Sequence, residues 1–495
     1  MAVAFAVAVT VLIPLAYLVV RASDGGWQAF RATLWRGRTL RLAVRSLALT
    51  GVVTAITVVL GVGAAWLVAR TDLVGRRVWR VLLVLPLALP SYVAAWAWIA
   101  YRPSLAGGLG ATIVLVSISY PYVYLPTLGA LHRNDGSLEE VATTLGRRPL
   151  GVFWSVTVPQ IRIAVVGGAL LVGLYTISEF GAVSIMRYES LTQTIYRSYR
   201  ASFDRRPAAV LGCLLVAMTL APALLTARSG QRQAIAKVGS GPVRSITAVR
   251  LGWRQVPVQL LLVAVVGISL GVPGWNLLRW SGRGRSSTDW SDVVDALTTT
   301  FFVASLAAVA TMLLAVPLGI LSARYPGRLS ASVTTAAYAG HSLPGIVVAL
   351  SLVFFGIRYA TPIYQRTPML VYAYVVLFLS LAIGAVHNVV AQAPPGLDDV
   401  ARSLGRTQLG AWRSVTLHLA APGIGAGAAL VFIATMKELP ATLLLRPIGM
   451  DTLATRLWTH TDAASYAAAA PYAVALVVVA SIPTVALTWS RLVRP

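Results

Sequence analysis

Two ten-residue segments decide how this chain is organised: LEEVATTLGR at residues 138–147 and LDDVARSLGR at residues 397–406. The second segment begins 259 positions after the first, and both lie between long apolar stretches. Each has two acidic residues directly after its first leucine and a glycine near its end. The repeat predicts a chain of two equivalent halves, each with one polar segment between apolar spans.

The rest of the chain is apolar enough to lie in a lipid bilayer. Of its 495 residues, 57% are hydrophobic and only 12% are charged, and the mean hydropathy is +0.75. Apolar windows of about 20 residues recur, which is the length that a helix needs to cross the hydrocarbon core. Backbone groups in lipid must be hydrogen-bonded within their own segment, so the spans are expected to be helices.

The expected fold is therefore an all-α membrane protein with about twelve transmembrane helices. The first apolar stretch lacks a basic n-region and a clear cleavage site, so we expect a retained helix rather than a signal peptide. The expected spans are residues 1–21, 43–69, 81–101, 108–132, 163–186, 207–227, 257–278, 296–323, 331–356, 368–391, 421–445 and 470–490.

Further residues repeat with nearly the same spacing. They are Arg70 with Arg324 and Leu89-Pro90 with Leu343-Pro344, both at an offset of 254, and SEFGA at 178–182 with KELPA at 437–441, at 259. We therefore expect two six-helix halves related by a pseudo-two-fold axis, with a pathway between them. The expected domains are residues 1–227 for the first half, 228–256 for a polar linker and 257–495 for the second half.

The net charge of +25 is the least expected feature of the composition. It indicates contact with anionic lipid headgroups, and no nucleic-acid partner is expected because no basic, aromatic-interleaved stretch is present. With the acidic repeats placed inside, 21 Lys and Arg fall inside and 19 outside, a bias too small for the positive-inside rule to decide the orientation. Two outer clusters oppose the rule: Arg31, Arg36, Arg38 and Arg41, and Arg197, Arg200, Arg205 and Arg206.

The repeated acidic segment predicts a short helix on the membrane surface. Acidic residues at the start of a helix complement its positive end, and Gly146 and Gly405 permit a sharp turn where it ends. Such a helix suits docking into a groove on another protein. The alternative is a plain interfacial loop, which two copies at equivalent places disfavour.

The two segments resemble the EAA loops of binding-protein-dependent ABC importer permeases. That pattern is Glu-Ala-Ala, three residues, Gly, nine residues, then Ile-x-Leu-Pro. The first copy departs from it at Val141; in the second, Asp399 replaces Glu and His418 replaces Pro. The resemblance implies two fused permease domains, with coupling loops near residues 134–160 and 393–419. It implies that an ATPase contacts Glu139, Glu140, Ala142, Gly146, Asp398, Asp399, Ala401 and Gly405.

The resemblance also implies the surroundings of the chain. It implies two copies of an ATP-binding cassette subunit that bind ATP and Mg, a solute-binding protein outside, and a multi-pass location in the bacterial cytoplasmic membrane. The chain itself has no G-x-x-x-x-G-K-[ST] phosphate loop, so we expect no enzymatic activity, no catalytic residues and no cofactor. The lone Cys213 excludes a thiolate metal site, and no resident metal is expected.

Two carboxylates are expected within apolar spans, Glu179 and Glu438. A charge there is costly, which makes each one a functional-site hypothesis. They could flank the pathway and attract a cation. Alternatively, they could have a structural role, in which each accepts hydrogen bonds from backbone donors freed at a helix break or pairs with an arginine. The candidate pathway or gate residues are Glu179, Glu438, Lys437, Gly181, Pro440, Pro90 and Pro344.

The sequence around these carboxylates resembles the ferric-iron importer branch, as does DTLATR at 451–456. This resemblance implies ferric iron as the cargo, a hard cation that prefers oxygen ligands. Thiamine, aminoethylphosphonate and polyamine-type importers are alternatives within the same family. An ion-coupled secondary transporter would also show repeats and intramembrane carboxylates, but it would not explain two EAA-like loops. A membrane-embedded enzyme would need a convergent catalytic set that the sequence lacks.

Overall fold

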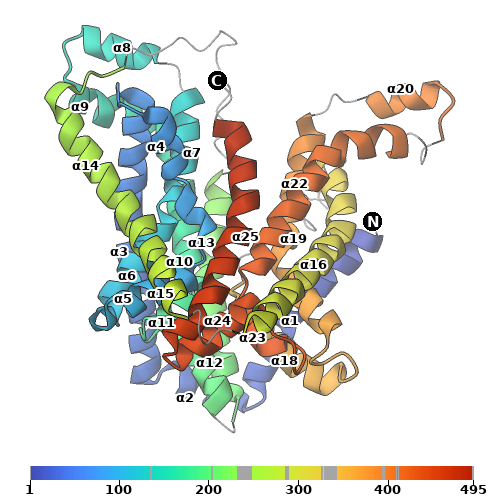
Figure 1. Cartoon of the computed structure of the whole chain (residues 1–495). Helices are drawn as coiled ribbons and strands as arrows, with labels where there is room; N and C mark the ends of the chain where they lie inside the picture. Colours follow the sequence, from blue (N-terminus) through green and yellow to red (C-terminus); the bar gives the residue numbers. More distant parts are fainter. Residues whose placement is uncertain are drawn as a thin grey trace. The chain divides into compact units, whose positions relative to one another are not determined.

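The computed structural model describes residues 2–133, 136–201, 204–230, 248–284, 289–324, 327, 343–392, 396–407, 410 and 412–492. Across these residues the chain is helical, and its one β-type contact is an isolated bridge between Thr71 and Val249 (Figure 1). The expected all-α fold is confirmed. Most of the predicted linker, residues 231–247, and the start of the predicted ninth span, residues 331–342, lie outside the described residues.

Twelve apolar helical stretches are found in the described part of the chain, as expected. Seven are long and apolar enough to cross a membrane by length and composition, a bent pair supplies an eighth, and four are shorter. The seven are Gly37–Arg70, Gly108–Arg133, Pro149–Ser178, Gly252–Gly282, Trp290–Arg324, Thr367–Gln392 and Trp412–Met436; the bent pair is Arg76–Ala88 with Ser91–Tyr101; the shorter ones are Leu12–Ser23, Arg206–Pro222, Gly345–Tyr359 and Tyr466–Ile482.

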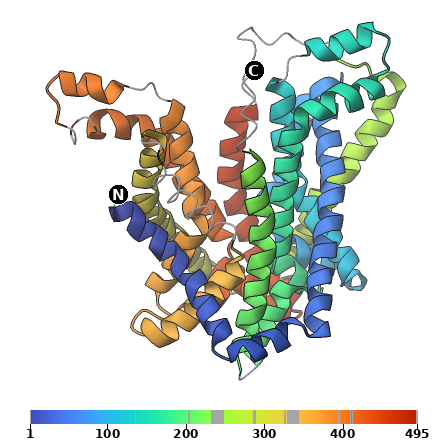
Figure 2. The ribbon, with the colours of Figure 1, turned by 180° about the vertical axis from the view of Figure 1, so that it is seen from behind.

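The helices form two compact units, and each unit combines residues from both halves of the sequence. Unit 1 comprises residues 1–39, 194–220 and 289–459, and unit 2 comprises residues 40–193, 221–288 and 460–495. The first helix, α1 (Ala2–Ser23), packs against α18 (Gly345–Tyr359) of the second half, as Figure 2 shows from behind. The first helices of the second half belong in the same way to unit 2, where α15 packs against α5.

The remaining helices are divided between the two units. In unit 2 they are α4 (Arg76–Leu82), η1 (Leu85–Ala88), α5 (Ser91–Tyr101), η2 (Pro103–Leu105), α6 (Gly108–Ser119), α7 (Pro121–Arg133), α8 (Ser137–Thr144), α9 (Pro149–Val152), η3 (Phe153–Thr157), α10 (Val158–Ser178), α11 (Gly181–Ile185), η4 (Gly252–Arg254), α14 (Gln255–Val266), η5 (Gly267–Gly271), α15 (Val272–Gly284) and α25 (Tyr466–Leu492). In unit 1 they are α2 (Gly26–Leu34), α16 (Trp290–Arg324), α19 (Thr367–Gln392), α20 (Leu397–Ser403), η6 (Trp412–Thr416), α22 (Leu417–Met436) and α23 (Pro440–Leu445). Four helices have residues in both units: α3 (Gly37–Arg70), α12 (Leu191–Ala201), α13 (Arg206–Gly230) and α24 (Leu453–Asp462).

Small residues allow the long helices to pack closely. In unit 1, α16 packs against α19 and α22, and a Cβ at Gly319 would lie 2.7 Å from the Cβ of Val386. In unit 2, α10 packs against α7, where a Cβ at Gly168 would lie 2.8 Å from the Cα of Val123. Helices in lipid gain no hydrophobic effect from one another, so such close van der Waals contact is a main source of their association.

Three predicted spans are interrupted rather than continuous. The span predicted at 81–101 bends by 91° between η1 and α5, because Pro90 has no N–H group and disfavours helical geometry in Leu89. The span predicted at 163–186 breaks after Ser178, where α10 ends, and the one at 421–445 breaks after Met436, where α22 ends. In each of these two spans a short helix resumes near a glutamate, which places polar groups at the break.

Candidate functional site

The first acidic repeat forms α8, and the helix ends in a defined turn. Gly146 follows with φ +79°, in the left-handed region that favours glycine. Its N–H donates to the Thr143 carbonyl at 2.9 Å, and the Arg147 N–H donates to the Ala142 carbonyl at 3.1 Å. These two bonds form a Schellman motif, which satisfies carbonyls that would otherwise lack partners at the helix end.

The second acidic repeat forms α20 and ends in the same way. Gly405 has φ +83°, its N–H donates to Arg402 at 3.0 Å, and the Arg406 N–H donates to Ala401 at 3.1 Å. The sharp turn expected at both glycines is confirmed. The two repeats are therefore alike in backbone geometry as well as in sequence.

Both short helices present an apolar ridge to solvent. Leu138, Val141 and Leu145 of the first copy, with their counterparts Val400 and Leu404 of the second, have exposed fractions between 54% and 79%. Ala142 and Ala401 face inward and are buried. Exposed apolar side chains gathered on one face of a surface helix mark a site of contact with another protein or with the membrane. Of the acidic pair on α8, Glu140 is exposed beside this ridge.

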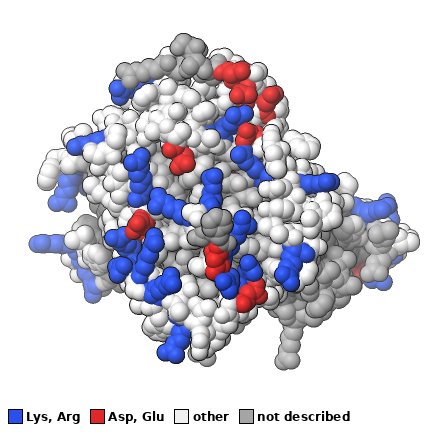
Figure 3. Space-filling view, turned by 90° about the horizontal axis from the view of Figure 1, so that it is seen from below, with Lys and Arg blue, Asp and Glu red and all other residues white. Residues whose placement is uncertain are grey.

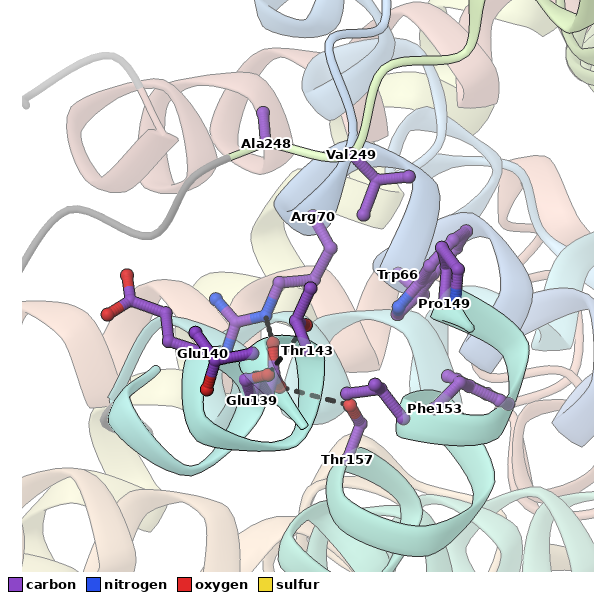
Figure 4. Close-up of a pocket in the computed structure, with 12 residues that line it drawn as sticks. Trp66, Arg70, Glu139, Glu140, Thr143, Pro149, Phe153, Thr157, Ala248 and Val249 are labelled. Carbon is purple, nitrogen blue, oxygen red and sulfur yellow. Dashed lines mark hydrogen bonds and ion pairs between the residues drawn. The ribbon is translucent and has the colours of Figure 1, made fainter. Parts of the chain in front are cut away.

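Glu139, by contrast, is buried, because its side chain points toward the interior of the protein. Its Oε2 lies 3.1 Å from Nε of Arg70, at the end of α3. Its Oε1 accepts a hydrogen bond from the Thr157 hydroxyl at 3.0 Å, in η3. Arg70 and Glu139 are only 6% and 9% exposed. This buried ion pair, drawn in Figure 4, anchors α8 to two long helices.

A cavity of about 580 Å³ lies against the ion pair, between α8, α9 and the end of α3 (Figure 4). Ala248 and Val249, at the end of the predicted linker, complete its wall. The Val249 N–H donates to the Arg70 carbonyl at 2.9 Å, and the Leu251 N–H donates to the Asp72 carboxylate at 2.8 Å. The described end of the predicted linker is thus held beside α8.

The second copy differs in what its acidic residues contact. Asp399 is exposed and pairs with Arg402 at 3.5 Å, within α20. The side chain of Asp398, the counterpart of Glu139, lies outside the described side chains. Thr416 corresponds to Thr157 and is likewise buried. The acidic pairs were singled out from the sequence, but no role was assigned to Arg70. The repetition of Arg70 as Arg324 was the feature that could have indicated its importance.

The candidate pathway residues of the first half meet inside unit 2. Glu179 follows the last residue of α10, and its Oε1 accepts a hydrogen bond from the Ser91 hydroxyl at 2.8 Å. The same oxygen accepts the Ala182 N–H at 3.0 Å, at the start of α11. Gly181 fits closely, since a Cβ there would lie 2.9 Å from the Cβ of Tyr92. One carboxylate therefore joins the break at Pro90 to the break after α10.

The equivalent residues of the second half meet inside unit 1. Glu438 accepts hydrogen bonds from the Ala441 N–H at 3.0 Å and from the N–H and hydroxyl of Thr442, each at 3.1 Å. Pro440 occupies the first turn of α23, where a missing N–H costs nothing. Pro344 precedes α18 in extended geometry, and Gly345 lies directly against Glu438. Lys437, half-buried, ends α22.

Both carboxylates thus cap a helix that resumes after a break. A buried helix start leaves N–H groups without partners, and a carboxylate that accepts them removes that cost. This geometry corresponds to one of the two roles that the sequence left open for Glu179 and Glu438. Among the described residues, no group of three or more His, Cys, Asp or Glu side chains could hold a metal ion.

Gly345→Ala is expected to destabilise the protein. The new Cβ would lie 2.7 Å from Oε1 of Glu438, and overpacking of this kind costs about 1–3 kcal/mol. The measurement is the thermal unfolding midpoint in detergent, which should fall by several degrees. Gly425→Ala in α22 is the matched control, because nothing lies within 4 Å of its Cβ position. Equal midpoints for the two variants would contradict the packing of Gly345 on Glu438.

Comparison with protein families gives one match, repeated along the chain. The model of the family described as "Binding-protein-dependent transport system inner membrane component" matches residues 57–235 and again residues 315–495. Each match contains one acidic repeat and one of the glutamate-capped breaks.

Individual relatives differ in how much of the chain they match. The Fe(3+)-transport system permease protein FbpB 2 of Haemophilus influenzae is 34% identical over 475 residues, 95% of this chain and 94% of its own length. The sulfate transport system permease protein CysW of Synechococcus elongatus is 27% identical over 46% of this chain and 88% of its own length. The molybdenum transport system permease protein ModB of Mycobacterium tuberculosis is 33% identical over 35% of this chain and 70% of its own length.

Proposed function

Because this chain belongs to the family of binding-protein-dependent transport system inner membrane components, we propose that it is the permease subunit of an ABC importer for ferric iron. It is a multi-pass protein of the cytoplasmic membrane and a transport subunit. One observation carries the choice of cargo: the similarity to a ferric-iron permease extends over nearly the full length of both chains. The sulfate and molybdenum permeases match less than half of this chain.

Energy for transport comes from a separate ATPase that docks on α8 and α20. Two copies of this ATP-binding cassette subunit bind ATP and Mg, one for each coupling helix. The exposed ridges at Val141 and Val400 and the exposed carboxylates Glu140 and Asp399 support this assignment. Gly146 and Gly405 end the helices, and Glu139 positions α8 from within. The ATPase side is the cytoplasmic side, and a solute-binding protein delivers cargo from the other.

The chain is divided as a first permease half at 1–227, a linker at 228–256 and a second half at 257–495. Two separate matches to one family model, at residues 57–235 and 315–495, support a division into two halves. Within each half, the paired breaks form the gate of the pathway: Pro90, Glu179 and Gly181 in the first, and Pro344, Lys437, Glu438 and Pro440 in the second. Contacts between the proline breaks and the carboxylates support this assignment.

The direct test is uptake of radioactive ferric iron by cells that contain or lack this chain. Uptake should require the chain, the ATPase and the solute-binding protein together. Purification of the tagged chain should also recover the ATPase. Uptake that persists without any ATPase would instead favour an ion-coupled carrier and overturn the proposal.

Glu179→Gln together with Glu438→Gln is expected to lower ferric-iron uptake several-fold while the importer still assembles. An amide oxygen can still accept the hydrogen bonds that cap α11 and α23, so the exchange removes charge and retains the acceptor. The measurements are iron uptake and recovery of the ATPase with the tagged chain. Unchanged uptake by the double variant would show that the two charges are not needed in the pathway. The two side chains would then only cap α11 and α23.

A further inference from the structure

Arginine is abundant on the side of the chain opposite the coupling helices. The proposed function gives these arginines no role. In the proposed orientation 19 Lys and Arg lie outside the membrane. The positive-inside rule does not explain these outer arginines, because it places basic residues of short loops on the cytoplasmic side. Figure 3 shows this face from below, with basic side chains outnumbering acidic ones.

Two arginine-rich segments of unit 1 adjoin one another there. One runs from the end of α1 through α2 to the start of α3, and the other comprises the described residues from α12 to the start of α13. A Cβ at Gly25, which precedes α2, would lie 3.6 Å from Nη1 of Arg206. We call the exposed or half-buried arginines of these segments the arginine face: Arg21, Arg31, Arg36, Arg38, Arg197, Arg200, Arg205 and Arg206.

Acidic side chains on these segments offset only part of this charge. Asp24 pairs with Arg21 at 2.6 Å, and Asp204 pairs with Arg206 at 2.9 Å. The hydrogen bond from Arg206 also holds the pKa of Asp204 below its usual range, so this aspartate is ionised at neutral pH. Eight arginines against two aspartates leave six net positive charges on the arginine face.

Several of these side chains are held in place by aromatic rings. The Arg205 guanidinium lies 4.8 Å from the centre of the Tyr199 ring, and that of Arg200 lies 5.8 Å from the Tyr196 ring. Trp27, in the first turn of α2, and Trp35, directly after α2, are largely exposed. Ordered arginine and exposed tryptophan are the residues that dominate binding energy at protein interfaces. A guanidinium held in this way is suited to bidentate recognition of a carboxylate.

We propose that the arginine face is a docking surface for an acidic patch on the solute-binding protein. This inference rests on the proposed function, which supplies a protein partner on that side. Within unit 1, the arginine face and the coupling helix α20 lie at opposite ends (Figure 1). An acidic protein surface would neutralise the six excess charges, and attraction between the surfaces would speed encounter.

The test measures binding of the importer's own solute-binding protein, loaded with ferric iron, to the full complex in nanodiscs. One variant carries Arg197→Gln with Arg200→Gln, and another carries Arg31→Gln with Arg36→Gln. The matched control carries Arg102→Gln with Arg279→Gln, which removes two exposed arginines of unit 2 on the same side of the membrane. Retention volume and unfolding midpoint show that each variant is folded.

We expect each arginine-face variant to weaken binding about tenfold, mainly through a slower association rate, and to reduce its salt dependence. The control should change affinity less than about twofold. The loss should be equal in zwitterionic and anionic nanodiscs. Unchanged affinity, or a loss equal to the control's, would overturn the inference while the proposed function stands. A loss seen only with anionic lipid would overturn it in favour of lipid headgroups. If the unaltered complex bound no solute-binding protein, the proposed function would fail as well.

Discussion

Arg70→Met is expected to reduce iron uptake and ATPase recovery at least tenfold. The exchange leaves the Glu139 carboxylate buried and without its ion-pair partner, and breaking a buried pair in this way costs about 3–5 kcal/mol. The structure can avoid that cost by releasing α8 so that Glu139 reaches water. A released α8 no longer presents its apolar ridge in a fixed position. The measurements are ferric-iron uptake and the amount of ATPase purified with the tagged chain.

The double variant Arg70→Met with Glu139→Gln should recover much of the loss. It removes both charges, and replacing a buried pair by neutral groups is often tolerated. The glutamine oxygen can still accept the hydrogen bond from Thr157. Arg77→Met is the control, because Arg77 is exposed in α4 nearby. If the double variant were as impaired as the single one, Arg70 would act by some means other than holding Glu139.

Gly146→Val together with Gly405→Val is expected to abolish stable ATPase binding and iron uptake. Both glycines have positive φ, and a left-handed conformation costs a residue with a side chain about 1–2 kcal/mol. A β-branched side chain is among the least tolerant of it. The Schellman turns would therefore open and the chain after each helix would leave in another direction. Each single variant should weaken ATPase binding less than the pair does.

Gly151→Val provides the control for these exchanges. Gly151 lies in α9 of the same loop, without positive φ and with nothing within 4 Å of its Cβ position. It tests whether added bulk in this loop is itself harmful. Normal ATPase recovery with the glycine pair exchanged would show that the turns are not needed for coupling.

The sequence alone determined the class of the fold and its duplication. Apolar windows of membrane-spanning length gave twelve helical stretches, since lipid leaves a spanning segment little choice but to satisfy its own backbone. Local chemistry also located the turns at Gly146 and Gly405, because a Schellman turn depends on a few neighbouring residues. The repeat also marked Pro90 and Pro344 as candidate positions, and α5 and α18 each begin directly after one of these prolines.

Tertiary structure alone decided how those pieces combine. Glu139 and Glu140 are adjacent and chemically identical, yet one is buried on Arg70 and the other is exposed. Their difference depends on which helix face meets α3, a contact between residues that are 69 positions apart. The meeting of Ser91 with Glu179 and the packing of α1 on α18 are likewise distant in sequence. Hydrophobic periodicity and helix propensity predict where a helix forms and which of its faces is apolar. Only packing against other helices determines which residues each face contacts.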